Sequence, residues 1–171
     1  LPLCGKTLDI AWLLSEGYRV AGAELVEIAV IQLFEELNVE PTISEVGETW
    51  LYHAQDIDIF VGNIFDVSAN VLGPVDALYD RAALVALPKE MRISYAIHLT
   101  KITKRAPQLL ISYEYDQGLM QGPPFSVSNA EVSQHYQDIY NLFLISSSDV
   151  IGGFKGNCPA IENVWCIHIN K

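Results

Sequence analysis

The alternation of short apolar runs with helix-like stretches limits the fold of this 171-residue chain more than any other feature. Residues 18–24, 57–62 and 108–115 are rich in apolar side chains, as expected of buried strands. Residues 26–37 and 88–105 show helical patterns between them. Parallel strands need a crossover connection, which is usually a helix. The sequence therefore predicts an α/β fold with an open, mostly parallel sheet and helices on both of its faces.

Local signals indicate where several elements begin and end. Thr7 or Asp9 can cap a first helix, and Gly17 ends it. Residues 75–79 form a strand-like run that follows a glycine–proline turn. Pro88 suits the first turn of the longest helical pattern, because proline lacks the N–H that would go unpaired there.

The second half of the chain ends in a pattern typical of a hairpin. Ser128 and Glu131 form a capping-box signature, which predicts a short helix over 129–137. Residues 140–148 and 163–169 then predict a closing antiparallel pair of strands. Neither an internal repeat nor a linker-like tract interrupts the sequence, so we expect residues 1–171 to form a single domain.

Apolar positions indicate which side chains fill the core. We expect Trp12 and Trp165 to be core residues. Helical spacing predicts a buried stripe on the helix over 26–37. The members of that stripe are Ile28, Ile31, Leu33 and Phe34.

Composition argues against two classes of partner. The formal net charge is -11 and only ten Lys and Arg are present, whereas phosphate backbones and anionic lipid surfaces select cations. No apolar run reaches the roughly 18 residues that span a bilayer. The three cysteines match neither an even disulfide set nor a metal spacing. We therefore expect a soluble cytoplasmic protein, a monomer by default, that binds neither nucleic acid nor membrane.

The first residues of the sequence resemble the end of an element. Leu1, Pro2 and Leu3 have the character of the last residues of an apolar strand, and a glycine turn follows them directly. We therefore expect that the sequence lacks an N-terminal segment and most of a first strand.

A glycine turn and an acidic residue occur at the spacing of a nucleoside-binding half. Gly5 follows the first apolar run, and Glu24 ends the next strand about 20 residues later. Glycine allows close approach to a ligand, and the acid can accept hydrogen bonds from ribose hydroxyls. Each feature alone is more often a plain turn or a solvated acid. Because G-x-G-x-x-G is absent, the pair favours a cofactor without phosphates, and S-adenosylmethionine is the common one.

Five sequence blocks resemble the bacterial thiopurine S-methyltransferase family, in family order. They are PLCGKTLDIAWL at 2–13, VAGAELVEIAV at 20–30, NIFDV at 63–67, VDALYDRAALVALPKEMR at 75–92, and the segment from EYDQ to QGPPFSV at 114–127. The resemblance covers essentially the whole chain. It implies a class I methyltransferase fold, Rossmann-like, with an antiparallel C-terminal hairpin.

The resemblance implies a set of cofactor-binding residues in the first part of the chain. Leu3 and Gly5 of the PLCGK turn would lie against the methionine part of S-adenosylmethionine. Glu24 would hold the ribose, with Leu25 beside the adenine. Leu3 has a plain alternative as a core residue.

Three further positions follow from the same resemblance. Asn63 and Ile64 would flank the adenine, and Asn63 replaces the Asp of many bacterial members. Arg81 would lie close to both cofactor and acceptor and act in catalysis. The alternatives are that Ile64 is core and that Arg81 forms a structural ion pair with Asp80.

The implied reaction moves a methyl group to the sulfur, selenium or tellurium atom of a small molecule and releases S-adenosylhomocysteine. Such soft nucleophiles need no strong base, and the scattered histidines provide neither a base nor a metal site. Two alternatives remain: a truncated or degenerate relative that binds the cofactor without turnover, and a nucleotide-linked oxidoreductase, which the absence of a phosphate loop makes a poor fit.

Overall fold

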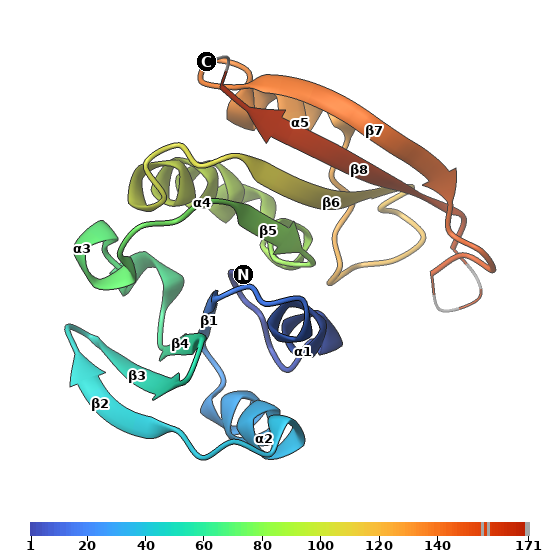
Figure 1. Cartoon of the computed structure of the whole chain (residues 1–171). Helices are drawn as coiled ribbons and strands as arrows, with labels where there is room; N and C mark the ends of the chain where they lie inside the picture. The colour runs from blue at the N-terminus through green and yellow to red at the C-terminus, as the bar shows by residue number, and fades with distance from the viewer. Residues whose placement is uncertain (155, 157, 170–171) are drawn as a thin grey trace. The chain divides into compact units, whose positions relative to one another are not determined.

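The computed structural model of the chain describes residues 1–154, 156 and 158–169. The chain divides into two compact units, Leu1–Gly73 and Pro74–Lys171. Each unit contains one four-stranded sheet with its own helices, and Figure 1 labels the elements.

The first unit is built on a mixed sheet of strand order β1-β4-β3-β2. The strands are β1 (Val20–Glu24), β4 (Ile57–Val61), β3 (Thr49–Ala54) and β2 (Thr42–Val46). β1 and β4 are parallel, with Val20 opposite Ile57 and Glu24 opposite Val61, so both strands end at the same edge. β4, β3 and β2 follow one another as antiparallel neighbours.

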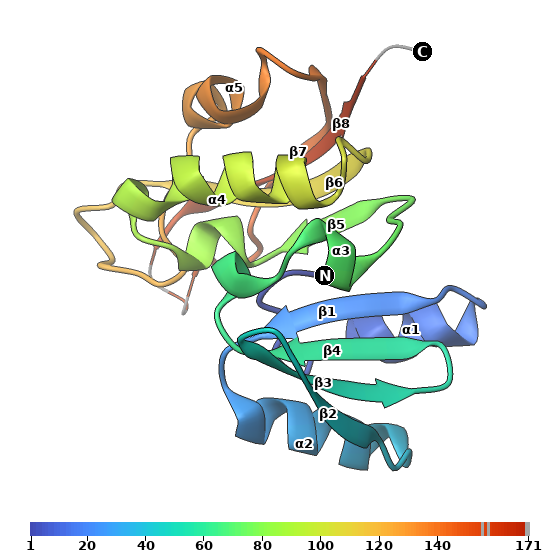
Figure 2. The ribbon, with the colours of Figure 1, turned by 90° about the vertical axis from the view of Figure 1, so that its left-hand side faces the viewer.

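Helices α1 (Leu8–Ser15) and α2 (Glu27–Leu37) lie on one face of this sheet (Figures 1 and 2). The predicted cap of α1 is confirmed, because the Thr7 side chain accepts a hydrogen bond from the Asp9 N–H at 3.3 Å. Two short elements complete the unit: the 3-10 helix η1 (Ile64–Asp66) and α3 (Ala69–Leu72).

The buried stripe of α2 differs from the prediction. Val30, Leu33 and Phe34 face the core at the spacing i, i+3, i+4, with exposed fractions of 3% or less. Ile28 is 58% exposed and Ile31 is 37% exposed, so assigning them to the stripe was wrong. The helix contacts the sheet along one row of side chains only. Val30 belongs to that row, whereas Ile28 and Ile31 lie outside it.

The prediction that Trp12 fills the core is also wrong, since its side chain is 60% exposed. Ile10 is fully buried, and Leu13 and Leu14, three and four residues later, pack against the same cluster. A residue two positions from Ile10 lies about 200° around the helix and points away from the core. Trp165, by contrast, is 6% exposed, which confirms its predicted place in the core.

The second unit contains a sheet of strand order β5-β6-β8-β7. The strands are β5 (Leu78–Arg81), β6 (Gln108–Tyr115), β8 (Ala160–His168) and β7 (Asn141–Asp149). β5 and β6 are parallel, and the other neighbouring strands are antiparallel. The closing hairpin of β7 and β8 is confirmed, whereas both sheets are more mixed than the predicted, mostly parallel arrangement.

The described residues of this unit form three helical segments: η2 (Leu84–Ala86), α4 (Lys89–Ile102) and α5 (Asn129–Tyr136). α4 and α5 lie on one face of the sheet (Figures 1 and 2). The capping box of α5 is confirmed, since the Ser128 hydroxyl accepts a hydrogen bond from the Glu131 N–H at 3.2 Å. No helix within the described residues is both long and apolar enough to cross a bilayer.

Two boundaries of the second unit shift from their predicted places. β5 begins at Leu78 rather than residue 75, because pairing starts where the Leu78 N–H donates to the Pro107 carbonyl at 2.8 Å. α4 ends at Ile102 rather than residue 105. Lys104 and Arg105 have φ of 52° and 64°, in the left-handed region, and this conformation ends the helix.

Candidate functional site

The candidate site of the first unit begins with the segment Leu1–Cys4, which runs beside β1. The Leu1 amino group donates to the Ala21 carbonyl at 2.7 Å, and the Ala23 N–H donates back to the Leu1 carbonyl at 3.1 Å. The Cys4 N–H donates to the Ala23 carbonyl at 3.0 Å. These bonds continue the sheet in the parallel sense and hold the following turn at the end of β1.

Gly22 allows this segment to pack closely on the sheet. A Cβ atom at Gly22 would lie 2.7 Å from Ile59 Cδ1 and 3.0 Å from Cys4 Sγ, closer than side chains normally approach. Cys4 is 8% exposed, and its burial raises the pKa of the thiol to about 11. The Cys4 thiol is therefore protonated near neutral pH and acts as a packing group rather than a nucleophile.

The Glu24 carboxylate joins the turn to the end of β1. Its Oε2 atom accepts a hydrogen bond from the Gly5 N–H at 2.8 Å, and its Oε1 atom accepts one from the Val26 N–H at 2.9 Å. The Glu24 carbonyl accepts a third bond, from the Gly62 N–H at 2.9 Å. A carboxylate offers about four lone-pair positions, so each oxygen can still accept one hydrogen bond from a ligand hydroxyl.

Gly5, which bonds Glu24, and Leu25, which follows it in the chain, offer different surfaces to a ligand. Gly5 has φ of 52°, and a Cβ built on it would meet nothing within 4 Å, so the turn borders open space. Leu25 is 69% exposed, an apolar side chain directly after the acid. Leu3 is half-buried, with φ of 47°. A nucleoside has a flat apolar ring and vicinal hydroxyls. An apolar surface beside a pre-oriented carboxylate suits both of these parts.

Asn63 and Ile64 follow β4 at the same edge of the sheet. The Asn63 side-chain oxygen accepts a hydrogen bond from the Phe65 N–H at 3.1 Å and caps η1. The amide group of Asn63 therefore presents its two N–H donors away from the cap. Ile64 is 9% exposed and counts among the buried residues of the chain. Gly62, which sequence analysis missed, links this loop to Glu24 through its N–H.

The structure brings six of the seven predicted residues together in the first unit and places Arg81 in the second. Arg81 ends β5 opposite Ile111 of β6, and its side chain is exposed. Successive side chains of a strand point to opposite faces, and Asp80 is fully buried. Asp80 and Arg81 are therefore presented to opposite faces of β5.

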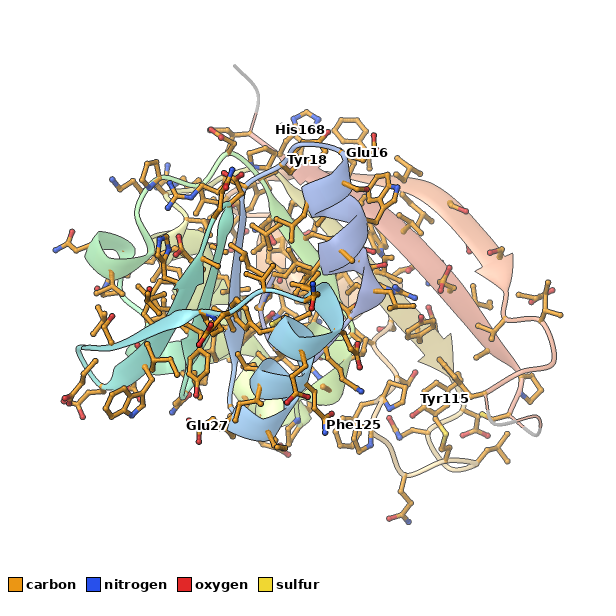
Figure 3. The ribbon with its side chains drawn as sticks, turned by 60° about the horizontal axis from the view of Figure 1, so that its bottom comes forward. Glu16, Tyr18, Glu27, Tyr115, Phe125 and His168 are labelled. Atoms are coloured by element: carbon orange, nitrogen blue, oxygen red, sulfur yellow. The ribbon has the colours of Figure 1, made fainter. Side chains whose placement is uncertain are left out.

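A buried arginine that sequence analysis missed holds the loop after β6. Arg92 of α4 is 3% exposed, donates to the carbonyls of Leu87 at 2.9 Å and Ser126 at 3.2 Å, and pairs with Glu131 at 2.7 Å. Its guanidinium lies 5.6 Å from the centre of the Phe125 ring, which Figure 3 labels beside Tyr115. The sequence offered no signal for this role, because a single arginine in a helix is usually solvated.

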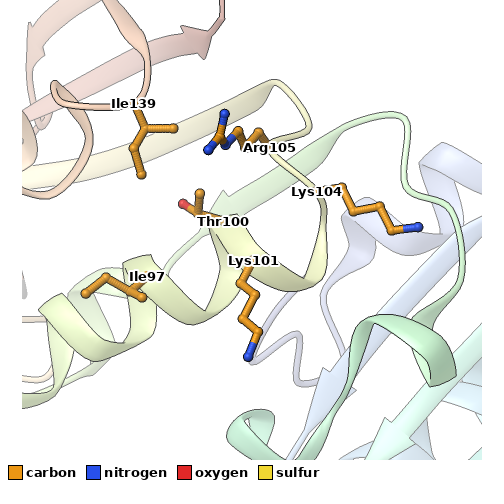
Figure 4. A pocket seen from close by; sticks show the side chains of 6 residues that line it. All are labelled: Ile97, Thr100, Lys101, Lys104, Arg105 and Ile139. Atoms are coloured by element: carbon orange, nitrogen blue, oxygen red, sulfur yellow. The ribbon is translucent and has the colours of Figure 1, made fainter.

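A concave region lies on the second unit but lacks the features of a ligand site. This hollow of about 560 Å³ is lined by Ile97, Thr100, Lys101, Lys104, Arg105 and Ile139. Figure 4 shows Lys101 and Lys104 pointing away from Arg105, so the three cations do not converge on one point. We therefore assign the candidate site to the residues around Glu24.

Comparisons with known proteins show the family of the chain. The sequence model of the thiopurine S-methyltransferase family matches residues 1–163. Thiopurine S-methyltransferase of Xanthobacter autotrophicus is 54% identical over 167 residues, which are 98% of the chain and 78% of that relative. The protein of the same name from Teredinibacter turnerae is 49% identical over 170 residues, 99% of the chain and 79% of that relative.

Solved structures of low sequence identity share the fold. A SAM-dependent methyltransferase of Methanosarcina mazei gives a TM-score of 0.70 at 13% identity, covering 99% of this chain and 91% of that one. The 1,6-didemethyltoxoflavin-N1-methyltransferase of Burkholderia thailandensis, solved with S-adenosylhomocysteine, gives 0.63 at 13% identity, covering 99% and 69%. These likenesses agree with the predicted class I fold. The chain therefore belongs to the thiopurine S-methyltransferase family and is an S-adenosylmethionine-dependent methyltransferase.

Proposed function

We propose that this protein methylates the sulfur, selenium or tellurium atom of a small molecule, in a site organised by Glu24. The observation that carries the proposal is the bond between the Glu24 carboxylate and the Gly5 N–H, 2.8 Å long, which fixes the PLCGK turn to the end of β1. S-adenosylmethionine, when bound, supplies an electrophilic methyl group on a sulfonium ion.

The residues of the first unit fit that cofactor. Glu24 has free lone pairs for the ribose hydroxyls, and the exposed Leu25 side chain offers an apolar surface to the adenine. Gly5 borders open space, so the turn can lie against the methionine part without a side chain in the way. Asn63 would donate to a ring nitrogen through its amide, with Ile64 behind it. We expect Leu3 to complete the wall of the turn.

Arg81 is the residue that we propose to act on the acceptor. The thiolate or selenolate is the nucleophile of such an acceptor, so an oriented positive charge that stabilises the anion can take the place of a strong base. A guanidinium stays charged at all relevant pH values and can hold an anion through several N–H donors. Excluding water from the methyl donor and the acceptor, and holding them in line for methyl transfer, would supply much of the acceleration.

We also propose that the protein works in the cytoplasm. Cys4, Cys158 and Cys166 are free thiols, two of them buried, and a reducing compartment keeps them in that state.

Calorimetric titration with S-adenosylhomocysteine tests the cofactor half of the proposal. We expect a single site that the Glu24→Gln variant weakens by at least about tenfold, or 1.4 kcal/mol. NADH, titrated in parallel, should give no heat of binding. Binding of NADH with none of S-adenosylhomocysteine would favour the oxidoreductase alternative and overturn the proposal.

Transfer of a radiolabelled methyl group to a thiopurine, to a simple aromatic thiol and to selenite tests the acceptor half. We expect turnover on at least one of them and a fall of about tenfold or more in Arg81→Ala, with affinity for S-adenosylhomocysteine nearly unchanged. Arg19→Ala is the matched control, because Arg19 is exposed and pairs with Asp58 at 2.8 Å. Cofactor binding without turnover on any acceptor would point to the degenerate relative instead.

A further inference from the structure

A buried acid stands directly before the proposed acceptor arginine. Asp80 of β5 is fully buried, and its carboxylate accepts hydrogen bonds from the Tyr95 hydroxyl at 2.8 Å and from the Leu84 N–H at 3.1 Å. The Ala83 N–H bonds the same carboxylate. Tyr95 lies on α4 and is itself fully buried, so Asp80 links β5, the turn after it and the helix that covers it.

The turn that Asp80 holds contains a strained residue. Ala82 has φ of 68°, a left-handed conformation that is unfavourable for a residue with a side chain. Such a conformation persists when its surroundings determine it. Ala83, Leu84 and Val85 are fully buried, so the chain re-enters the core directly after Ala82. The turn therefore begins at Arg81, which is exposed, and is fixed from inside by the carboxylate of Asp80.

We propose that Asp80 is the positioning residue for Arg81: by accepting the N–H groups of the turn, it sets the direction in which the Arg81 side chain leaves β5. This inference rests on the proposed function, because Asp80 acts on the reaction only through Arg81. The two side chains point to opposite faces of the strand, so Asp80 does not touch the acceptor.

The chemistry of the contacts favours positioning over a charge effect. Burial raises the pKa of Asp80, while the bonds from Leu84, Tyr95 and Ala83 lower it. An asparagine in the same place has two lone pairs on its oxygen for the Leu84 and Ala83 N–H groups, and its amide could donate to the Tyr95 oxygen. Positioning therefore survives the change to Asn, whereas a role that needs the negative charge does not.

The test compares variants at position 80 with and without Arg81, using the whole chain. We expect Asp80→Ala to lower kcat by about tenfold or more, and Asp80→Asn to stay within about threefold of the parent. In the Arg81→Ala background, Asp80→Ala should cost less than about twofold, since the residue it acts through is gone. Affinity for S-adenosylhomocysteine should change by less than about twofold in every variant.

Tyr95→Phe serves if Asp80→Ala does not fold, because it removes one hydroxyl and preserves the volume of the side chain. We expect a fall in kcat of about threefold that disappears in the Arg81→Ala background. Glu131→Gln is the control, because it disturbs another acid of the same unit. Any loss of kcat that it causes should multiply with the loss caused by Arg81→Ala. If the loss of kcat in Asp80→Ala, or in Tyr95→Phe in its place, multiplied with that of Arg81→Ala, the positioning role of Asp80 would be overturned. The proposed role of Arg81 would stand. Unchanged turnover in Arg81→Ala would overturn both roles.

Discussion

Glu24 and Gly5, nineteen residues apart in the chain, are joined by a hydrogen bond of 2.8 Å from the Gly5 N–H to Glu24 Oε2. The other carboxylate oxygen accepts the Val26 N–H at 2.9 Å, so both partners of the side chain are N–H donors. Glutamine has one oxygen and one NH2 group, and the NH2 group must face one of these donors. Glu24→Gln should therefore lower the free energy of unfolding by about 1–3 kcal/mol, measured by urea denaturation.

Glu36→Gln is the matched control for that variant. Glu36 pairs with Lys6 of the same turn at 2.7 Å, but both side chains are 47% exposed. An exposed pair contributes about 0–1 kcal/mol, and its loss should leave the affinity for S-adenosylhomocysteine within about twofold of the parent. If both variants weakened the cofactor equally, the general charge of the turn would matter and the specific bonds of Glu24 would not.

Gly5→Ala should separate backbone strain from ligand contact. Gly5 and Gly17 have φ of 52° and 82°, and a Cβ at either would meet nothing within 4 Å. Both alanine variants should therefore lose about 1–2 kcal/mol of stability. Only Gly5→Ala should also weaken binding of S-adenosylhomocysteine, by about tenfold or more, because its new methyl group would occupy the open space beside the turn. Equal affinities in the two variants, measured by calorimetry, would contradict a ligand at this turn.

Sequence patterns predicted the elements that depend on local chemistry. The cap at Thr7, the capping box at Ser128 and the span of β6 each follow from residues that are neighbours in the chain. The same holds for the glycine turn at Gly5 and the acid at Glu24, which the spacing of strand and helix already placed at one sheet edge.

Features that depend on tertiary contacts were missed. Trp12 and Ile28 are as apolar as any core residue, and only the row of contacts between helix and sheet decides that they are exposed. The bonds from Tyr95 to Asp80 and from Arg92 to Ser126 join residues 15 and 34 positions apart. No local pattern distinguishes such a buried charge from a solvated one, so these contacts were visible only in the fold.

Gly22→Ala should destabilise the junction between the N-terminal turn and the sheet. The added Cβ would lie 2.7 Å from Ile59 Cδ1, and Ile59 is fully buried with little room to move. Overpacking of this kind costs about 1–3 kcal/mol. Ile59→Val removes the clashing methyl group and costs about 0.5–1.5 kcal/mol alone. The double variant should be more stable than the sum of the two losses predicts, and strict additivity in urea denaturation would exclude the clash.

Ionisation of Tyr52 should lower the stability of the chain at alkaline pH. Its side chain is 3% exposed and donates a hydrogen bond to Glu27 at 2.6 Å. Burial, followed by this bond to a carboxylate, raises the pKa of Tyr52 from 10.0 to about 12. The unfolded chain therefore loses this proton from about pH 10, while the folded chain keeps it until about pH 12. Because the folded state binds more protons in that window, stability should fall as the pH rises through it.

Tyr52→Phe should remove that contribution. Near neutral pH the variant should be less stable by about 1 kcal/mol, for the lost bond to Glu27. Between about pH 10 and 12 its free energy of unfolding should fall less steeply than that of the parent, so the difference between the two narrows. Tyr18→Phe is the control, because the Tyr18 side chain, labelled in Figure 3, is 59% exposed. The difference in free energy of unfolding between the parent and Tyr18→Phe should change much less over this pH range. Parallel curves for the parent and Tyr52→Phe, from thermal unfolding at each pH, would show that the phenol of Tyr52 ionises equally in both states.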